Sequence, residues 1–113
     1  MKMIVAFVQP FMAQKVVSAL HEIEGLSGAS FSEVRGFGRG RAAGVSNVTD
    51  EELFGTVPRI RVEAMVPDTL ADRVVRAVRD AVHTGHRGDG KVCVVPLERC
   101  IRIATGDEGE AAV

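Results

Sequence analysis

The stretch that decides the fold is residues 59–84, RIRVEAMVPDTLADRVVRAVRDAVHT, in which a strand pattern is followed at once by a helix pattern. Every second residue between 59 and 64 is apolar, which predicts a strand with one buried and one polar face. The apolar members are Ile60, Val62 and Ala64, and the polar members are Arg59, Arg61 and Glu63. After Pro67, Asp68 is a suitable helix N-cap. Apolar residues at helical spacing then continue to about residue 84: Leu70, Val74, Val78, Ala81 and Val82.

The first part of the chain has the same order of elements. Residues 3–9 are mostly apolar and end at Pro10, which predicts a buried strand. A helix is expected next, as far as Gly25, because apolar residues recur at steps of three and four. These residues are Ala13, Val16, Val17, Leu20 and Ile23. A second strand is expected at about residues 29–37.

The last part of the chain predicts one clear strand and one short one. The clear strand covers residues 92–95, and Ile101 and Ile103 suggest the short one. The whole order, β-α-β, a long loop and β-α-β, predicts an α+β ferredoxin-like sandwich in a single domain, residues 1–113. Both helices would cover one face of an antiparallel sheet, so the other face could meet a partner subunit or line a ligand cleft.

Composition excludes several classes of function. The 113 residues carry 14 basic and 15 acidic side chains and no Trp or Tyr, which argues against a nucleic-acid binder. No apolar run approaches the length of a membrane span, so we expect a cytoplasmic protein without direct membrane insertion. Cys93 and Cys100 match no metal or redox spacing. We expect them to be buried thiols, with a thiol switch as the alternative.

Two glycine-bearing segments are the candidates for chemistry. Residues 36–41, GFGRGR, could approach an anion closely, or could simply end a strand beside a flexible loop. Residues 85–91, GHRGDGK, have three glycines and a lysine, which suit an anion-binding nest of backbone N–H groups better than an ordinary connection. His83 and His86 could ligate a metal or stabilise a helix C-terminus. No nucleophile, base or carboxylate pair is readable, so we expect no enzyme.

These segments resemble the PII nitrogen-signalling proteins, and the resemblance covers about residues 1–110. Its matching stretches are QPF at 9–11, EVRGFGR at 33–39, PRIRVE at 58–63, TGHRGDGKV at 84–92 and IRIATG at 101–106. The resemblance implies a homotrimer in which ATP and ADP compete for three clefts between subunits. It also implies a long T-loop, residues 38–57, that docks on a target, which would be a membrane transporter or an enzyme of nitrogen or carbon metabolism.

The resemblance also implies which residues contact the ligands. The nucleotide-binding residues would be Gly28, Ser30, Gly36, Gly38, Arg39, Met65, Gly88, Asp89, Gly90, Lys91 and Arg102. The partner-binding residues of the T-loop would be Arg41, Asp50, Glu51, Glu52 and Phe54. The loop has few large apolar groups, so we expect it to be mobile in the free protein. We also expect the tail, residues 106–113, to be flexible.

Departures from the family pattern are also informative. Gly40 stands where the family has the Gln that coordinates Mg²⁺ and positions 2-oxoglutarate. Arg59 replaces a Lys that pairs with 2-oxoglutarate, and Ala104 replaces a phosphate-binding Arg. Glu52 stands at about the place of the modified Tyr. These changes argue against the usual Mg²⁺ and 2-oxoglutarate response and against uridylylation.

Two other readings stay open at this point. The first is a ferredoxin-like trimer with a metal-binding or metal-tolerance role, through His83, His86 or the cysteines. The second is an enzyme that acts on a nucleotide.

Overall fold

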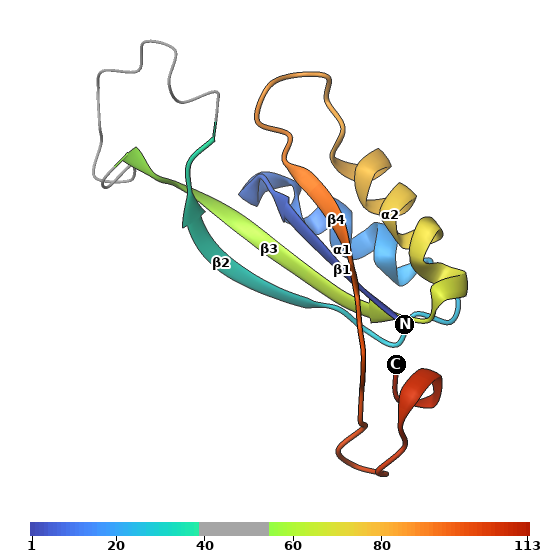
Figure 1. Cartoon of the computed structure of the whole chain (residues 1–113). Helices are drawn as coiled ribbons and strands as arrows, with labels where there is room; N and C mark the ends of the chain where they lie inside the picture. Colours follow the sequence, from blue (N-terminus) through green and yellow to red (C-terminus); the bar gives the residue numbers. More distant parts are fainter. Residues whose placement is uncertain (39–54) are drawn as a thin grey trace.

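Four strands and two helices follow one another in the order β1-α1-β2-β3-α2-β4 in the computed structural model, which describes residues 1–38 and 55–113. The strands are β1 Lys2–Val8, β2 Ser30–Gly36, β3 Val57–Val66 and β4 Lys91–Pro96, and the helices are α1 Ala13–His21 and α2 Asp68–Val82. Short 3-10 turns cover Pro10–Met12 and Gly109–Ala112. The sheet is antiparallel with strand order β2-β3-β1-β4, which confirms the predicted ferredoxin-like fold (Figure 1).

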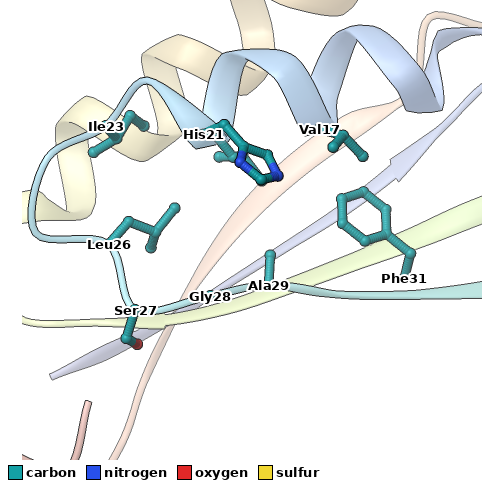
Figure 2. A pocket seen from close by; sticks show the side chains of 9 residues that line it. Val17, His21, Ile23, Leu26, Ser27, Gly28, Ala29 and Phe31 are labelled. Carbon is teal, nitrogen blue, oxygen red and sulfur yellow. The ribbon is translucent and has the colours of Figure 1, made fainter.

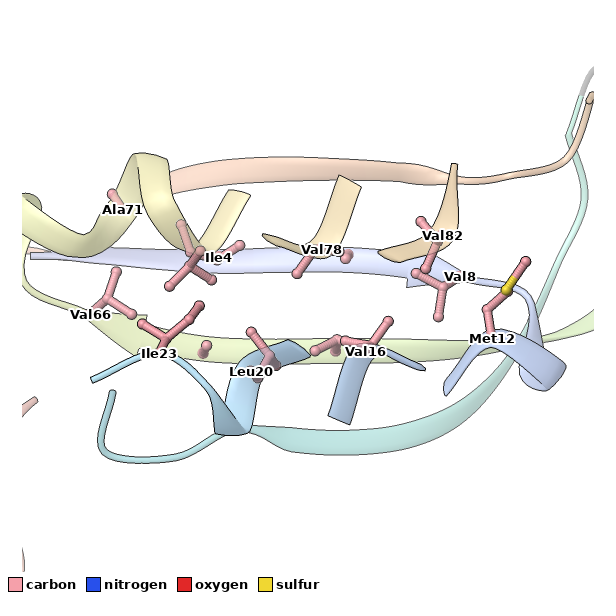
Figure 3. Packing of buried hydrophobic residues seen from close by; sticks show 14 residues of the cluster. Ile4, Val8, Met12, Val16, Leu20, Ile23, Val66, Ala71, Val78 and Val82 are labelled. Atoms are coloured by element: carbon pink, nitrogen blue, oxygen red, sulfur yellow. The ribbon is translucent and has the colours of Figure 1, made fainter. Parts of the chain in front are cut away.

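The core lies between the two helices and one face of the sheet (Figure 3). Because side chains alternate along a strand, every second residue of β1 enters this core, and the same holds for the end of β3. The buried residues are Ile4, Ala6, Val8, Met12, Val16, Leu20, Ile23, Val62, Ala64, Val66, Ala71, Val74, Val78 and Val82. The two helical stripes read from the sequence therefore do form the helix side of the core.

The other face of the sheet, which we call the open face, carries the polar residues of β3 as predicted. The guanidinium of Arg61 lies 2.5 Å from Glu63 Oε1 and 5.4 Å from the centre of the Phe7 ring. Apolar side chains share this face and are partly exposed, including Met65 at 42% and Val95 at 38%. Both helices pack on the opposite side, so neither covers these groups (Figure 1).

Two sequence expectations about single residues are wrong. Asp68 does not cap α2, because Pro67 holds the N-cap position and the Asp68 carboxylate instead accepts a hydrogen bond of 2.8 Å from the amino group of Met1. This contact, with Lys2 beside it, lowers the pKa of Asp68. Cys93 is exposed rather than buried because it lies on the open face, opposite Val5, and Cys100 is half-buried beyond the end of β4.

The expected short strand after β4 is also absent. Ile101 makes an isolated bridge with Glu108, and Ile103 is fully exposed. The backbone is instead used in a local turn, where Arg102 N–H donates to Asp107 and Gly106 N–H donates back to Arg102. The segment leaves the sheet at the end of β4 and folds back on itself (Figure 1).

Candidate functional site

One end of the sheet gathers most of the glycine-bearing segments. In an antiparallel sheet the ends of β1 and β2 meet the starts of β3 and β4. Here Gly36 is paired with Val57, and Phe7 is paired with both Arg61 and Lys91. Residues 84–91, which form most of the connection between α2 and β4 and include the first residue of β4, therefore lie beside the end of β1, at the same end of the sheet as the end of β2. We call residues 84–91 the glycine loop.

The glycine loop depends on three left-handed residues. Gly85, Gly88 and Gly90 have φ angles of 84°, 88° and 103°, which side-chain-bearing residues rarely adopt. At Gly90 there is also no room for a side chain, because a Cβ there would lie 1.9 Å from the carbonyl oxygen of Phe7. The loop thus passes directly against the backbone of β1, and only glycine permits that approach.

Two side chains from elsewhere in the sheet reach the glycine loop. Gln9, just after β1, donates a hydrogen bond of 2.8 Å from its side-chain amide to the carbonyl of Gly88. The guanidinium of Arg59 is close as well, since its Nη2 lies 3.9 Å from the position of a Cβ on Gly88. Arg59 therefore brings a positive charge to the loop.

Inside the glycine loop, the carboxylate of Asp89 binds three donors. They are the Thr84 N–H at 2.8 Å, the Gly85 N–H at 3.1 Å and the Thr84 hydroxyl. These hydrogen bonds, chiefly those from Thr84, lower the pKa of Asp89, and His83 Nδ1 lies 3.8 Å from the same carboxylate. The hydroxyl oxygen of Thr84 in turn accepts a hydrogen bond of 3.1 Å from the backbone N–H of His86.

The remaining groups of the glycine loop are suited to an anion. The N–H groups of Arg87 and Gly88 donate to no group in residues 1–38 and 55–113. Lys91 is exposed at the start of β4, and no ion pair engages it within those ranges. Behind the loop, a cavity of about 150 Å³ is lined by core valines and by His83 and Asp89. Backbone donors beside a lysine form an electropositive site.

The sequence-predicted nucleotide residues fall into two groups. Gly36, Gly38, Gly88, Asp89, Gly90 and Lys91 lie at the end of the sheet that holds the glycine loop. Gly28, Ser30, Met65 and Arg102 lie toward the opposite end. Met65 pairs with Met3, four residues along β1 from Phe7, so the groups are about 14 Å apart along the strand. One chain therefore does not bring the whole set together.

Six predicted residues cannot be placed. Arg39 of the nucleotide set lies outside the described residues, and so does the whole partner-binding set: Arg41, Asp50, Glu51, Glu52 and Phe54.

A second cavity, of about 260 Å³, lies between α1 and the start of β2. Figure 2 shows Val17, His21 and Leu26 facing the ring of Phe31 and the backbone at Gly28. Of the predicted nucleotide residues, only Gly28 lines it. Ser30 precedes Phe31 in β2 and therefore points to the open face, away from this cavity.

Sequence reasoning missed Gln9 and Thr84 as site residues. Both stand in the stretches that carry the family resemblance, which was the available signal. Among the described residues, His, Cys, Asp and Glu form no group of three or more that could hold a metal ion. Neither described helix has the length and apolar character needed to cross a membrane.

Comparison with known proteins gives one consistent result. The family model "Nitrogen regulatory protein P-II" matches residues 1–107. The chain is 40% identical over 113 residues to the nitrogen regulatory protein P-II of Haemophilus influenzae, and 37% identical to that of Azospirillum brasilense. It is 37% identical to nitrogen regulatory protein P-II 1 of Escherichia coli. Each of these alignments covers the whole of both chains.

Proposed function

The chain belongs to the PII nitrogen regulatory protein family, a family of signalling regulators, and we propose that it senses adenine nucleotides. In this proposal ATP and ADP compete for clefts between the subunits of a cytoplasmic homotrimer. The bound nucleotide biases the T-loop between conformations with different affinity for a target protein. The role is regulatory rather than catalytic.

The glycine loop is the observation that carries the nucleotide proposal. It offers the backbone N–H groups of Arg87 and Gly88 beside the exposed ammonium group of Lys91, on a backbone whose shape the glycines and Gln9 define. Arg59 adds a further positive charge beside Gly88. Donors that are already in place bind a phosphate chain without a large cost of ordering.

The separation of the two residue groups supports a cleft between subunits. Lys91 starts β4, whereas Arg102 lies beyond its end, so one chain does not bring both to a single phosphate group. A neighbouring copy can supply Arg102 to the glycine loop of the first. A closed trimer repeats that contact three times and forms three equivalent clefts.

The open face supports the same assembly. It combines the Arg61–Glu63 pair with exposed Met65, Cys93 and Val95, and no described helix packs on it. A chain of this size gains stability when further apolar surface is buried between copies. We therefore propose that the open face packs against the other subunits.

The target is proposed to bind through the T-loop. Its acidic run, Asp50 to Glu52, would meet a basic patch on a membrane transporter or on an enzyme of nitrogen or carbon metabolism. Such binding is expected to weaken as salt is raised. Replacing the three acidic residues together by Ala should abolish target binding while leaving nucleotide binding intact; unchanged target binding would remove this run as the docking element.

Calorimetry and light scattering test the core of the proposal. We expect ATP and ADP to bind at one site per chain, to displace one another, and to bind a particle of three chains. The Lys91→Ala variant should bind both nucleotides about 10- to 100-fold more weakly, because a charge-assisted contact is lost. Lys15→Ala, on the exposed face of α1, is the matched control and should bind normally. A monomer, or no binding of either nucleotide, would contradict the proposal.

A further inference from the structure

Asp89 presents a chemical difficulty in a phosphate-binding loop. An ionised carboxylate has no proton to donate and repels a phosphate group, so direct contact would require a bridging cation. The structure shows instead that the Asp89 carboxylate is already engaged by donors of the glycine loop itself. These donors belong to Thr84 and Gly85, which stand at the beginning of the loop, whereas Asp89 stands near its end.

The hydrogen bonds of Asp89 and Thr84 separate the donors of the loop into two sets. Thr84 and Gly85 give their N–H groups to Asp89, and His86 gives its N–H to the Thr84 oxygen. The next N–H groups, of Arg87 and Gly88, remain without an acceptor in the described ranges. The hydrogen bonds that close the loop therefore leave the N–H groups of Arg87 and Gly88 available to bind an anion.

We propose that Thr84 and Asp89 form a latch that holds the glycine loop in its anion-binding shape, and that Asp89 is a positioning residue rather than a phosphate contact. The inference rests on the proposed nucleotide site and adds a role for Thr84 that the resemblance did not supply. The lowered pKa of Asp89 agrees with it, because the latch requires the ionised carboxylate as acceptor.

The latch makes a prediction that a direct contact does not make. Asp89→Asn removes the charge of the acceptor and should weaken ADP binding by about 10-fold, whereas Thr84→Val removes only the hydroxyl donor, keeps the Thr84 and Gly85 N–H groups, and should weaken it less. The double variant should be about as weak as Asp89→Asn alone, because the loss of the hydroxyl adds little once the acceptor is weakened. Thr84→Ser keeps the hydroxyl and should bind as the native protein does.

The latch can also be tested in the free protein, so that the test does not depend on which ligand binds. Hydrogen exchange in the free protein should show the Thr84 and Gly85 amides protected, and both should lose protection in Asp89→Asn. The chemical-denaturation midpoint should stay near that of the native protein, since the latch is exposed and outside the core. That result separates loop opening from general unfolding.

The outcomes that overturn the latch differ from those that overturn the proposed function. Native protein that binds neither ATP nor ADP, with both amides protected, contradicts the nucleotide site and leaves the latch standing. Unprotected amides in the native protein contradict the latch. ADP binding that is lost in Asp89→Asn while the Thr84 and Gly85 amides stay protected, or that is lost only when Mg²⁺ is present, makes Asp89 a direct or cation-bridged contact. Additive losses in the double variant contradict the latch as well.

Discussion

The side-chain amide of Gln9 donates a hydrogen bond of 2.8 Å to the backbone oxygen of Gly88, a residue 79 positions further along the chain. The bond joins the residue that follows β1, a central strand of the sheet, to the middle of the glycine loop. The loop therefore takes its position from the sheet and not only from its own turn residues.

Gln9→Ala should loosen the glycine loop without unfolding the protein. Removing an exposed hydrogen bond costs only about 0.5–1.5 kcal/mol, so the denaturation midpoint should fall slightly. Nucleotide affinity should fall several-fold, because the loop must be ordered when the ligand binds. Calorimetry on this variant is compared with Gln14→Ala, an exposed position on α1 that should leave binding unchanged. Equal nucleotide affinity in the two variants would mean that the Gln9–Gly88 hydrogen bond is unimportant for binding.

Gly90 and Gly85 provide a matched test of backbone approach. Both have left-handed φ angles, but only Gly90 lies against Phe7, where a Cβ would be 1.9 Å from the carbonyl oxygen; nothing lies within 4 Å at Gly85. Gly85→Ala should cost about 1–2 kcal/mol of unfolding free energy, the price of the left-handed conformation alone. Gly90→Ala should cost clearly more, because β1 or the loop must move. Urea unfolding measures both, and equal losses would contradict the close approach.

The lowered pKa of Asp89 predicts how the glycine loop responds to acid. The folded state lowers this pKa below its ordinary value of 3.8, so the Asp89 contacts contribute fully above that value and are lost as the pH falls through the lowered pKa. The loop should therefore stay closed at any pH above about 4. Carbon NMR of the Asp89 carboxyl group follows the titration directly. In Thr84→Val the pKa should rise toward 3.8; a native value at or above 3.8 would be inconsistent with the hydrogen bonds described.

2-Oxoglutarate should have little effect on ATP affinity in this chain. Gly40 offers no side-chain oxygen to a metal ion, so a ligand that would bridge the metal and the loop loses its anchor. Because coupling between two ligands is reciprocal, ATP titrations with Mg²⁺, with and without 2-oxoglutarate, should agree within about twofold. A several-fold increase in ATP affinity would show that Arg59 and backbone groups suffice for 2-oxoglutarate.

The sequence predicted the elements of the fold because their patterns are local. The alternation through Val62 and Ala64 and the stripe through Val74 and Val78 depend only on neighbours within a few residues, and the structure buries all four side chains. Asp68 was assigned wrongly as a cap because its true partner, the Met1 amino group, is 67 residues away. Ile101 and Ile103 looked like a strand, but a turn between Arg102 and Asp107 takes their backbone out of the sheet.

The sequence predicted where the candidate site lies along the chain, but not how its residues contact one another. The glycines and Lys91 marked residues 85–91 as an anion loop from spacing alone. The role of Asp89 was not visible, because its contact with Thr84 exists only once Gly85 and Gly88 adopt left-handed φ angles. The separation of Lys91 from Arg102 was equally hidden, since residues eleven apart look close in the sequence while β4 holds them at opposite ends of the sheet.

In the proposed trimer two chains build each nucleotide cleft, and a trimer assembled from two different variants shows whether they do. Lys91→Ala and Arg102→Ala should each weaken ADP binding about 10- to 100-fold, so that few of their sites fill at ADP concentrations near the native Kd. If Lys91 of one chain and Arg102 of its neighbour serve one cleft, unfolding the two variants together and refolding them as an equal mixture should restore native affinity in about a quarter of the clefts. Calorimetry of the mixture then shows about one native-affinity site per four chains. No recovered sites, in a mixture that light scattering shows to have assembled and exchanged chains, would contradict the shared cleft.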